Sequence, residues 1–373
     1  MTEKISVQLA RTIMTRYPHP DHFPYRSWSY SQGLMLMGFV HLYEKTGEGR
    51  YRDYVLKYAD FHVSPEGKIY RFTGSSMDDM MAGAVIVWAY RETGEERYRL
   101  ACEEILSKFD DFPQTSKGGF WHSRHAVSEM WVDGVFMGGM FLTHYGSLIG
   151  KSEACFSEVV KQLNVIHECC HKKGGLLYHA WSECPKTPWA NRITGCSTDV
   201  WSEGLGWYAL ILAETVRLMP DAMPKKQQVI HRLTELLDTL SAMQCAMDGL
   251  FYQVVDKGND PQNWTDTSGS AMFLYAFAQA VRMGIGDCET YKQVVQRCWQ
   301  GVQERCVCNE KGLIDVLGAC DGLCVQNNYD AYITYPRVAN AKEAVGAVLW
   351  AAALLEPSFQ SSPNESLVTL YKC

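Results

Sequence analysis

The sequence predicts an all-α fold, an (α/α)6 toroid of six helical hairpins with short β-strands in the loops of one rim. Three observations predict it: a repeated helix–turn–helix motif, an alternation of two kinds of helix, and a recurring Gly-aromatic loop motif. Because these features run along most of the chain, we expect a single catalytic domain over residues 1–373.

The repeat is the most direct of these observations. Residues 43–51 (YEKTGEGRY) are echoed by residues 90–98 (YRETGEERY). Each copy runs into a segment with helical periodicity, residues 51–61 and 98–109. Each copy therefore predicts the end of one helix, a glycine-containing turn and the start of a second helix.

Two kinds of helix alternate along the chain. Six segments are apolar nearly all round, which is typical of buried helices: residues 30–43, 78–90, 131–145, 201–218, 269–283 and 343–355. The other segments are amphipathic with a charged face: residues 3–16, 50–61, 96–109, 153–170, 225–244 and 289–305. Glycines in the apolar set cost about 1 kcal/mol each relative to alanine but permit close helix approach. A closed inner ring inside an outer ring follows.

A motif of glycine, apolar, aromatic and polar residues follows the amphipathic helices. It occurs at residues 67–71, 118–122, 174–179, 249–253 and 312–315. Each copy leads into the start of the next inner helix, so we expect these loops and their short strands on one rim of the toroid. That rim is the expected site of chemistry.

Charge and hydropathy exclude several classes of partner. The formal net charge is -7 and we find no dense run of Lys and Arg, which argues against nucleic acid. Residues 1–16 mix charges among apolar residues and lack the core of a signal peptide. The longest apolar stretches are too short or too polar to span a bilayer. We expect a cytoplasmic protein that is a monomer or weak homodimer and has no membrane partner.

The cysteines predict reduced thiols rather than a disulfide scaffold. Fourteen of them are spread over 373 residues, and no export signal precedes them. One cluster resembles a metal site, namely Cys306, Cys308, Cys320 and Cys324, but its spacing differs from the usual pair of zinc knuckles. We therefore expect no metal.

Aromatic and acidic side chains gather at the starts of the inner helices. Sugar sites need both kinds of group, because flat rings stack on pyranose faces while polar groups bond the hydroxyls. Helix capping would explain any one aspartate, and any one tryptophan could belong to the core. Capping does not explain the repeated pairing of Asp with Trp. The candidates are Tyr30, Asp78, Asp79, Trp131, Asp133, Asp199, Trp201, Trp264, Asp266 and Arg337.

Asp133 has the most apolar setting of these carboxylates, within residues 130–137 (MWVDGVFM). Burial there, with a second carboxylate such as Asp78 or Asp79 nearby, favours the protonated acid, and a protonated Asp is a usable general acid. His122 and His179 each end a Gly-aromatic loop. They are expected at the same rim, either as sugar ligands or as satisfied interfacial histidines.

Several motifs occur in an order that resembles the unsaturated rhamnogalacturonyl hydrolases, six-hairpin glycosidases related to the unsaturated glucuronyl hydrolases. They are residues 118–122 (GGFWH), 130–139 (MWVDGVFMGG), 177–181 (LYHAW), 188–191 (PWAN), 206–208 (GWY), 255–258 (VDKG) and 268–270 (SGS). Agreement in order over most of the chain is far more specific than any single motif.

The resemblance implies a hydrolase that removes the terminal 4,5-unsaturated uronic acid from lyase-generated oligosaccharides, with unsaturated rhamnogalacturonan disaccharide from pectin as the expected substrate. It implies that Asp133 protonates C4, and it makes Asp78 the second carboxylate. No metal or organic cofactor is implied. The expected substrate-binding residues are Tyr30, His122, Trp131, His179, Trp201, Trp207, Trp264 and Arg337.

One departure bears on specificity. The family commonly has an Arg two positions after the residue matching Trp201, and this chain has Glu203. An anion there would repel a uronate unless it points away or Arg337 or Arg192 compensates.

Two alternative functions stay open from the sequence. One is a sugar epimerase or isomerase on the same toroid, with His122 and His179 moving a proton. The other is a non-catalytic toroid that binds glycans, since a fold does not dictate a function.

Overall fold

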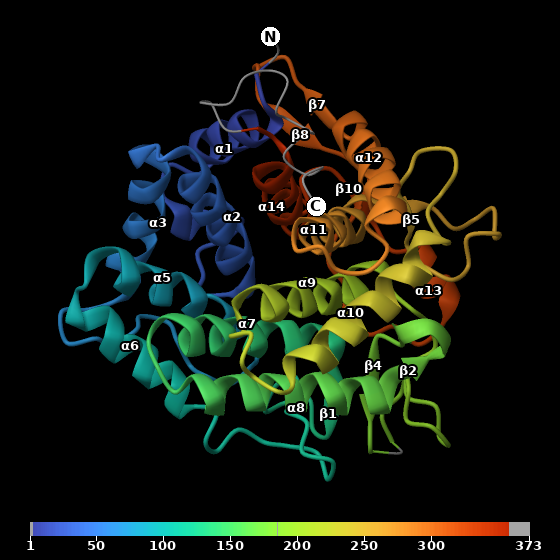
Figure 1. Cartoon of the computed structure of the whole chain (residues 1–373), viewed down its shortest axis with the longest axis horizontal. Coiled ribbons are helices and arrows are strands. Elements are labelled where there is room, and N and C mark those ends of the chain that lie inside the picture. Colours follow the sequence, from blue (N-terminus) through green and yellow to red (C-terminus); the bar gives the residue numbers. More distant parts are fainter. Residues whose placement is uncertain (1–2, 185, 358–373) are drawn as a thin grey trace.

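Helices arranged in two concentric rings make up most of the structure, a computed structural model that describes residues 3–184 and 186–357 (Figure 1). The inner ring consists of α2 (Tyr30–Thr46), α4 (Asp78–Met81) with α5 (Gly83–Thr93), α7 (Val132–Leu148), α9 (Ser202–Leu218), α11 (Thr267–Arg282) and α14 (Lys342–Leu355). The outer ring consists of α1 (Ile5–Arg16), α3 (Gly49–His62), α6 (Glu96–Ser107), α8 (Ser152–Cys170), α10 (Lys226–Ser241) and α12 (Cys288–Glu304).

The inner ring is closed. Each inner helix packs against the next in chain order, and α14 returns to α2. Each outer helix packs on the inner helix before it, while α1 packs on α14 and completes the last hairpin. The predicted toroid is therefore confirmed. The single domain that we predict over residues 1–373 also covers residues 1–2, 185 and 358–373, which lie outside the described residues.

The two copies of the repeat form the same turn. Gly47 and Gly94 end α2 and α5 in the left-handed region, with φ of 70° and 71°. Their backbone N–H groups donate to the carbonyls of Tyr43 and Tyr90. Glycine suits both positions because an L side chain is strained at such a φ.

The second inner helix differs from its prediction, because residues 78–90 form two helices instead of one. The break falls at Ala82, between α4 and α5. At this level α2 comes so close that a Cβ on Gly33 would lie 2.2 Å from the Met81 sulfur and 3.0 Å from Ala82 Cα. The short α4 carries Asp78 at the rim.

Short two-stranded antiparallel sheets lie in the loops between the rings. The paired strands are β1 (Glu129–Trp131) with β4 (Ala180–Ser182), β2 (His171–Lys172) with β3 (Leu176–Leu177), β5 (Phe251–Tyr252) with β6 (Thr265–Asp266), β7 (Cys306–Cys308) with β8 (Ile314–Val316), and β9 (Ala319–Cys320) with β10 (Arg337–Val338). Short helical turns occur at η1 (Pro20–His22), η2 (Lys173–Gly175) and α13 (Tyr329–Ile333). In Figure 1, β2, β4, β5 and α13 lie together on the right-hand side.

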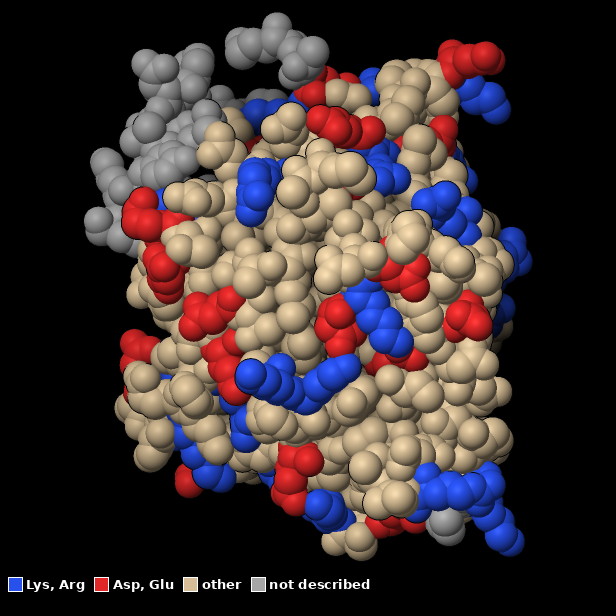
Figure 2. Space-filling view, turned by 90° about the vertical axis from the view of Figure 1, so that its right-hand side faces the viewer, with Lys and Arg blue, Asp and Glu red and all other residues tan. Residues whose placement is uncertain are grey.

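Figure 2 shows that side of the molecule face on. Basic and acidic side chains are interspersed across it, with no large area of one sign. Among the described residues, no helix combines the length and apolar character needed to cross a membrane. No disulfide joins the cysteines in this part of the chain.

Candidate active site

Backbone hydrogen bonds bring four segments of the rim together. Met77 N–H donates to the His122 carbonyl, which ties the start of α4 to the loop before β1. The pairing of β1 with β4 continues beyond the strands, since Val132 N–H donates to the His179 carbonyl over 3.0 Å. The loops that end in His122 and His179 thus place both imidazoles beside the start of α7, as the sequence predicts.

Asp133 lies in the first turn of α7 and faces His179. Its Oδ2 lies 3.2 Å from His179 Nε2, and Asp133 is 8% exposed. The other ring nitrogen, His179 Nδ1, lies 2.9 Å from the Tyr332 hydroxyl on α13. Asp133 makes no capping bond for α7, and its Oδ2 has no hydrogen-bond partner among the described residues. Oδ2 is buried against the His179 ring, and only 12% of the Asp133 side chain is open to solvent.

Asp78 and His122 form a second acid–histidine pair. Its Oδ2 lies 3.8 Å from His122 Nε2, and its side chain is 31% exposed. Burial among protein atoms raises the pKa of Asp78, and the charges of Asp133 and Asp79 add to the rise, while His122 and Lys342 oppose it. The His122 ring stacks on Trp131 with a centroid distance of 4.1 Å. Trp131 thus separates the two acid–histidine pairs.

The other rim aspartates have structural partners. Asp79 accepts from Ser75 N–H over 3.1 Å, and Asp199 pairs with Lys257. Asp266 caps α11 by accepting from Gly269 N–H over 2.7 Å. Capping, the ordinary role of an aspartate at a helix start, thus accounts for Asp266 but not for Asp133.

Comparison with known proteins agrees with this arrangement. Residues 5–358 match Glycosyl Hydrolase Family 88. The chain belongs to this family. The resemblance inferred from the ordered motifs is confirmed, and the protein is a glycosidase.

Individual relatives cover different parts of this family 88 chain. The 24.9 kDa protein in the picA locus of Rhizobium radiobacter is 29% identical over 229 residues, which is 58% of this chain and 97% of the relative. A family 105 glycoside hydrolase from C. acetobutylicum is 28% identical with a TM-score of 0.88, covering 94% of this chain and 99% of its own. The unsaturated glucuronyl hydrolase of Bacillus sp. GL1 is 14% identical with a TM-score of 0.68, covering 94% of each chain, and shows the shared fold alone.

The predicted substrate-binding aromatics of the family 88 chain fall into two groups. Tyr30, Trp131 and Trp264 are partly exposed. Trp201 and Trp207 are each 1% exposed. Trp201 packs against His179 with a centroid distance of 4.6 Å, and Trp207 packs edge-on against Tyr30 at 6.2 Å. Neither buried ring has an open face for a sugar, so the structure gives both a supporting position beneath the rim.

Arg337 lies at the outer edge of the rim. It is exposed on β10, and its guanidinium lies over the Trp264 ring at 5.2 Å from the centroid. The Trp264 indole N–H donates to the Ile333 carbonyl over 2.9 Å. This pair flanks α13, the helix that carries Tyr332.

Glu203 is buried beside two other carboxylates. It is 2% exposed, and its Oε2 accepts from the Ser268 hydroxyl over 2.7 Å. Burial raises the pKa of Glu203 well above its ordinary value, and the charges of Glu343 and Asp266 raise it further. The pKa shift of Glu203 therefore favours the neutral acid over the carboxylate.

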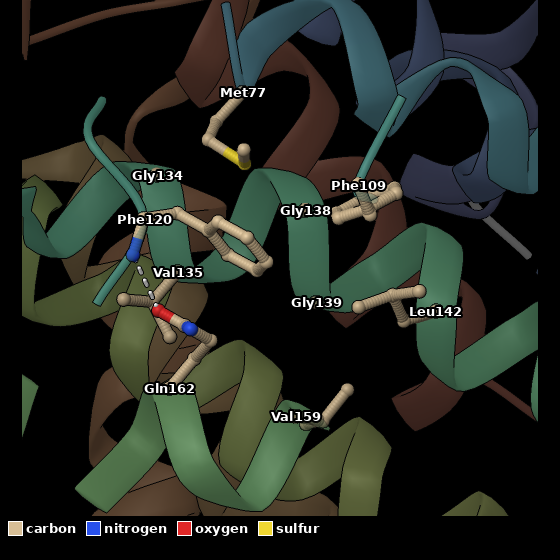
Figure 3. A pocket seen from close by; sticks show the side chains of 10 residues that line it. All are labelled: Met77, Phe109, Phe120, Gly134, Val135, Gly138, Gly139, Leu142, Val159 and Gln162. Carbon is tan, nitrogen blue, oxygen red and sulfur yellow. Dashed lines mark hydrogen bonds between the residues drawn. The ribbon is translucent and has the colours of Figure 1, made fainter. Parts of the chain in front are cut away.

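A small apolar cavity lies against α7, in the stretch that follows Asp133 (Figure 3). Met77, Phe120 and Gly134, which are close in sequence to Asp78, His122 and Asp133, line it together with Gly138 and Gly139. Its volume is about 10 Å³, so it holds no more than one water molecule. The cavity is too small for a sugar.

Sequence reasoning did not single out Tyr332 or Lys342 as site residues. Tyr332 follows a polar loop on a five-residue helix, and only its contact with His179 reveals it. Lys342 lies at the start of α14 beside Glu343.

The cysteine cluster whose sequence resembles a metal site begins in β7 and continues through β9. Among the described residues, no three His, Cys, Asp or Glu side chains are placed to hold a metal ion.

Proposed function

We propose that this family 88 glycosidase removes the terminal 4,5-unsaturated uronic acid from lyase-generated oligosaccharides, with unsaturated rhamnogalacturonan disaccharide as its substrate. The observation that carries the proposal is the pair Asp133 and Asp78. Both face histidines, whereas Asp79, Asp199 and Asp266 have structural partners. The likeness in fold to an unsaturated glucuronyl hydrolase supports the same reaction class.

The reaction is hydration of an enol ether. Asp133 donates a proton to C4, and the electron pair of the C4=C5 bond forms the new C–H bond, which leaves an oxocarbenium ion at C5. Water adds at C5, and Asp133 accepts the proton that the water loses, so the acid is regenerated. The hemiketal then opens to a keto-acid, and the shortened sugar leaves from C1.

The neighbouring groups position this acid. His179 fixes the Asp133 carboxyl from one side and is itself held by the Tyr332 hydroxyl. The pKa of Asp78 is raised by burial, which makes a second negative charge beside the sugar less favourable. Trp131 and Tyr30 present partly exposed rings for stacking and hydrogen bonding.

A turnover screen tests the proposal. Lyase products of rhamnogalacturonan, other pectins, glycosaminoglycans and algal polysaccharides are each incubated with the enzyme, and the loss of the ultraviolet absorbance of the C4=C5 bond is followed. We expect loss with the rhamnogalacturonan disaccharide and release of a keto-acid. Saturated aldoses that change configuration would instead indicate an epimerase, and saturable binding without any turnover would indicate a glycan-binding toroid.

Asp133→Asn tests the assigned acid. We expect the rate constant kcat to fall by about a thousandfold, because the amide cannot donate the proton to C4. The control is Asp266→Asn, which removes the charge of a capping carboxylate and should lower stability more than turnover. Full activity of Asp133→Asn with an unchanged circular dichroism spectrum would refute the role.

A further inference from the structure

A site for an unsaturated uronide needs a positive charge close to its acid group, because the substrate carboxylate is attached to C5, next to the protonated C4. Glu203, in the first turn of α9 at the rim, is an acid and supplies no such charge. Three cations of the rim have different neighbours: Lys257 pairs with Asp199, Arg337 lies over Trp264, and Lys342 pairs with Glu343. Of these three, Lys342 acts on the acid group Asp78, whose pKa its charge lowers.

Lys342 meets this requirement by its place in the fold. It is the first residue of α14, and its side chain is 21% exposed. Its Nζ lies 2.6 Å from Glu343 Oε1 and 5.8 Å from the centroid of the Tyr30 ring. Tyr30 donates to the same Glu343 oxygen over 2.6 Å. The ammonium group thus lies beside a buried carboxylate and a rim aromatic, and part of the lysine side chain stays open to solvent.

Two groups of the site show that Lys342 lies close to the acids. The pKa of Asp78 is raised by burial, and Lys342 opposes this rise together with His122. The pKa of the exposed Cys324 thiol is raised by burial and by the charges of Asp133 and Asp78, and Lys342 again opposes the rise. The charges of both acids and of the lysine therefore act on the same thiol, that of Cys324.

The buried glutamates do not cancel the charge of Lys342. Glu343 is 1% exposed and needs a cation, while its Oε2 has no hydrogen-bond partner among the described residues. The pKa of Glu203 is raised well above its ordinary value by burial and by Glu343 and Asp266, which disfavours a negative charge there. Glu343 thus holds the lysine at 2.6 Å, and the shift at Glu203 reduces its repulsion of an incoming carboxylate.

We propose that Lys342 binds the carboxylate of the substrate's terminal uronic residue, and that Glu343 is the residue that positions it. Lys342 would then restrict this enzyme to sugars with a free carboxylate. The inference rests on the proposed function for its substrate, yet it concerns recognition and can be tested apart from turnover.

The test compares a charged and a neutral ligand. Kinetics are measured on the unsaturated rhamnogalacturonan disaccharide and on its methyl ester, which keeps the double bond but has no charge. For Lys342→Gln we expect KM for the acid to rise about tenfold with kcat nearly unchanged, whereas the KM for the ester stays the same. Lys342→Arg should restore most of the preference for the acid.

Control variants separate recognition from folding. Lys225→Gln removes an exposed lysine at the start of the outer helix α10 and should leave both KM values unchanged. Glu343→Gln should raise KM for the acid without lowering kcat, since it releases the lysine without touching the acid group. Equal acid-to-ester KM ratios in wild type and Lys342→Gln would overturn the inference, even with full turnover.

A binding measurement covers the case in which the proposed reaction does not occur. Calorimetric titration with galacturonate and with galactose gives a ratio of dissociation constants that needs no chemistry. A ratio that favours galacturonate in wild type and falls about tenfold in Lys342→Gln would support Lys342 even if every unsaturated uronide failed as substrate. A ratio that Lys342→Gln leaves unchanged would overturn its role independently of turnover.

Discussion

Two glutamates of α9 are both buried, but their pKa values are shifted in opposite directions. Glu203 lies in the first turn of the helix, at the rim, and is 2% exposed. Glu214 lies about three turns further along, toward the other end of the toroid, and is 0% exposed. The pKa of Glu203 is raised well above its ordinary value, whereas that of Glu214 is lowered well below it.

Their neighbours account for the difference. Burial acts to raise the pKa of Glu214, but Arg217 overcomes it by donating over 2.9 Å and 2.6 Å, with His144 3.6 Å away. Tyr275 donates to the same carboxylate over 2.6 Å. Burial raises the pKa of Glu203 as well, and its charged neighbours Glu343 and Asp266 add to the rise.

The comparison shows that the partner, rather than the depth of burial, decides in which direction the pKa of a buried glutamate in this toroid is shifted. A carboxylate with a bidentate arginine joins neighbouring inner helices and is structural. An acid among other acids is costly to ionise, and such an arrangement is typical of functional sites. The rim end of α9, with Glu203, therefore belongs to the recognition site, whereas the other end, with Glu214, contributes to stability.

The largest expected effect is on the free energy of unfolding, and it comes from Glu214, at the end of α9 away from the rim. Glu214→Gln removes a fully buried carboxylate from the partly buried Arg217 guanidinium and from the Tyr275 hydroxyl, so we expect the free energy of unfolding to fall by about 3 kcal/mol. Urea unfolding at pH 7 measures it.

Glu203→Gln is the matched control for that prediction. An amide resembles the neutral acid and can still accept from Ser268, so the free energy of unfolding should change by less than about 1 kcal/mol. If both variants lost the same stability, the two glutamates would have the same charge and the comparison would be wrong.

The second prediction concerns pH. Because the folded-state pKa of Glu203 exceeds its unfolded value, stability should fall as pH rises from about 4.5 toward the folded pKa, by up to about 1.4 kcal/mol per pH unit. Lys342 opposes this effect, while Glu343 and Asp266 enhance it. Unfolding measured between about pH 5 and pH 8 should therefore give a flatter profile for Glu203→Gln than for wild type.

The pKa of Glu214 is shifted in the opposite direction to that of Glu203, so Glu214→Gln serves as the reference for the pH profile. Its lowered folded-state pKa contributes stability above the unfolded value, which is lost only as pH falls through that lowered pKa. The profile of Glu214→Gln should then run parallel to wild type between about pH 5 and pH 8. A Glu203→Gln profile that is also parallel would mean that Glu203 is ionised throughout this range.

Much of the fold could be predicted because it depends on patterns within single helices. Apolar helices had to be buried and amphipathic ones had to cover them, so the order of the two rings followed from periodicity. The break at Ala82 could not be predicted in the same way. It depends on the approach of α2 at Gly33, a contact between helices that no local pattern encodes.

Site residues could be predicted only where an acidic or imidazole side chain stands at the start of an inner helix or in the loop before it. Asp133, Asp78, His122 and His179 stand in loops that the repeat places on one rim, and the structure brings them together. The charge state of Glu203 was not predictable, since it depends on Glu343, which is 140 residues further along the chain.

The smallest expected effect concerns the contacts of Tyr332 with His179 and of His179 with Asp133, and it tests whether they affect turnover. Tyr332→Phe removes the hydroxyl that holds His179 Nδ1, so the imidazole that positions Asp133 is less well fixed. We expect kcat to fall about tenfold, which corresponds to about 1.4 kcal/mol, with KM nearly unchanged.

Tyr275→Phe is the matched variant at the other end, because it removes a hydroxyl that contacts Glu214 instead. It should lower the free energy of unfolding by about 1 kcal/mol and leave kcat at the wild-type value. Steady-state kinetics and urea unfolding on both variants decide the matter. If Tyr275→Phe slowed turnover as much as Tyr332→Phe does, the two ends of the toroid would be coupled, and stability and catalysis could not be assigned to separate regions.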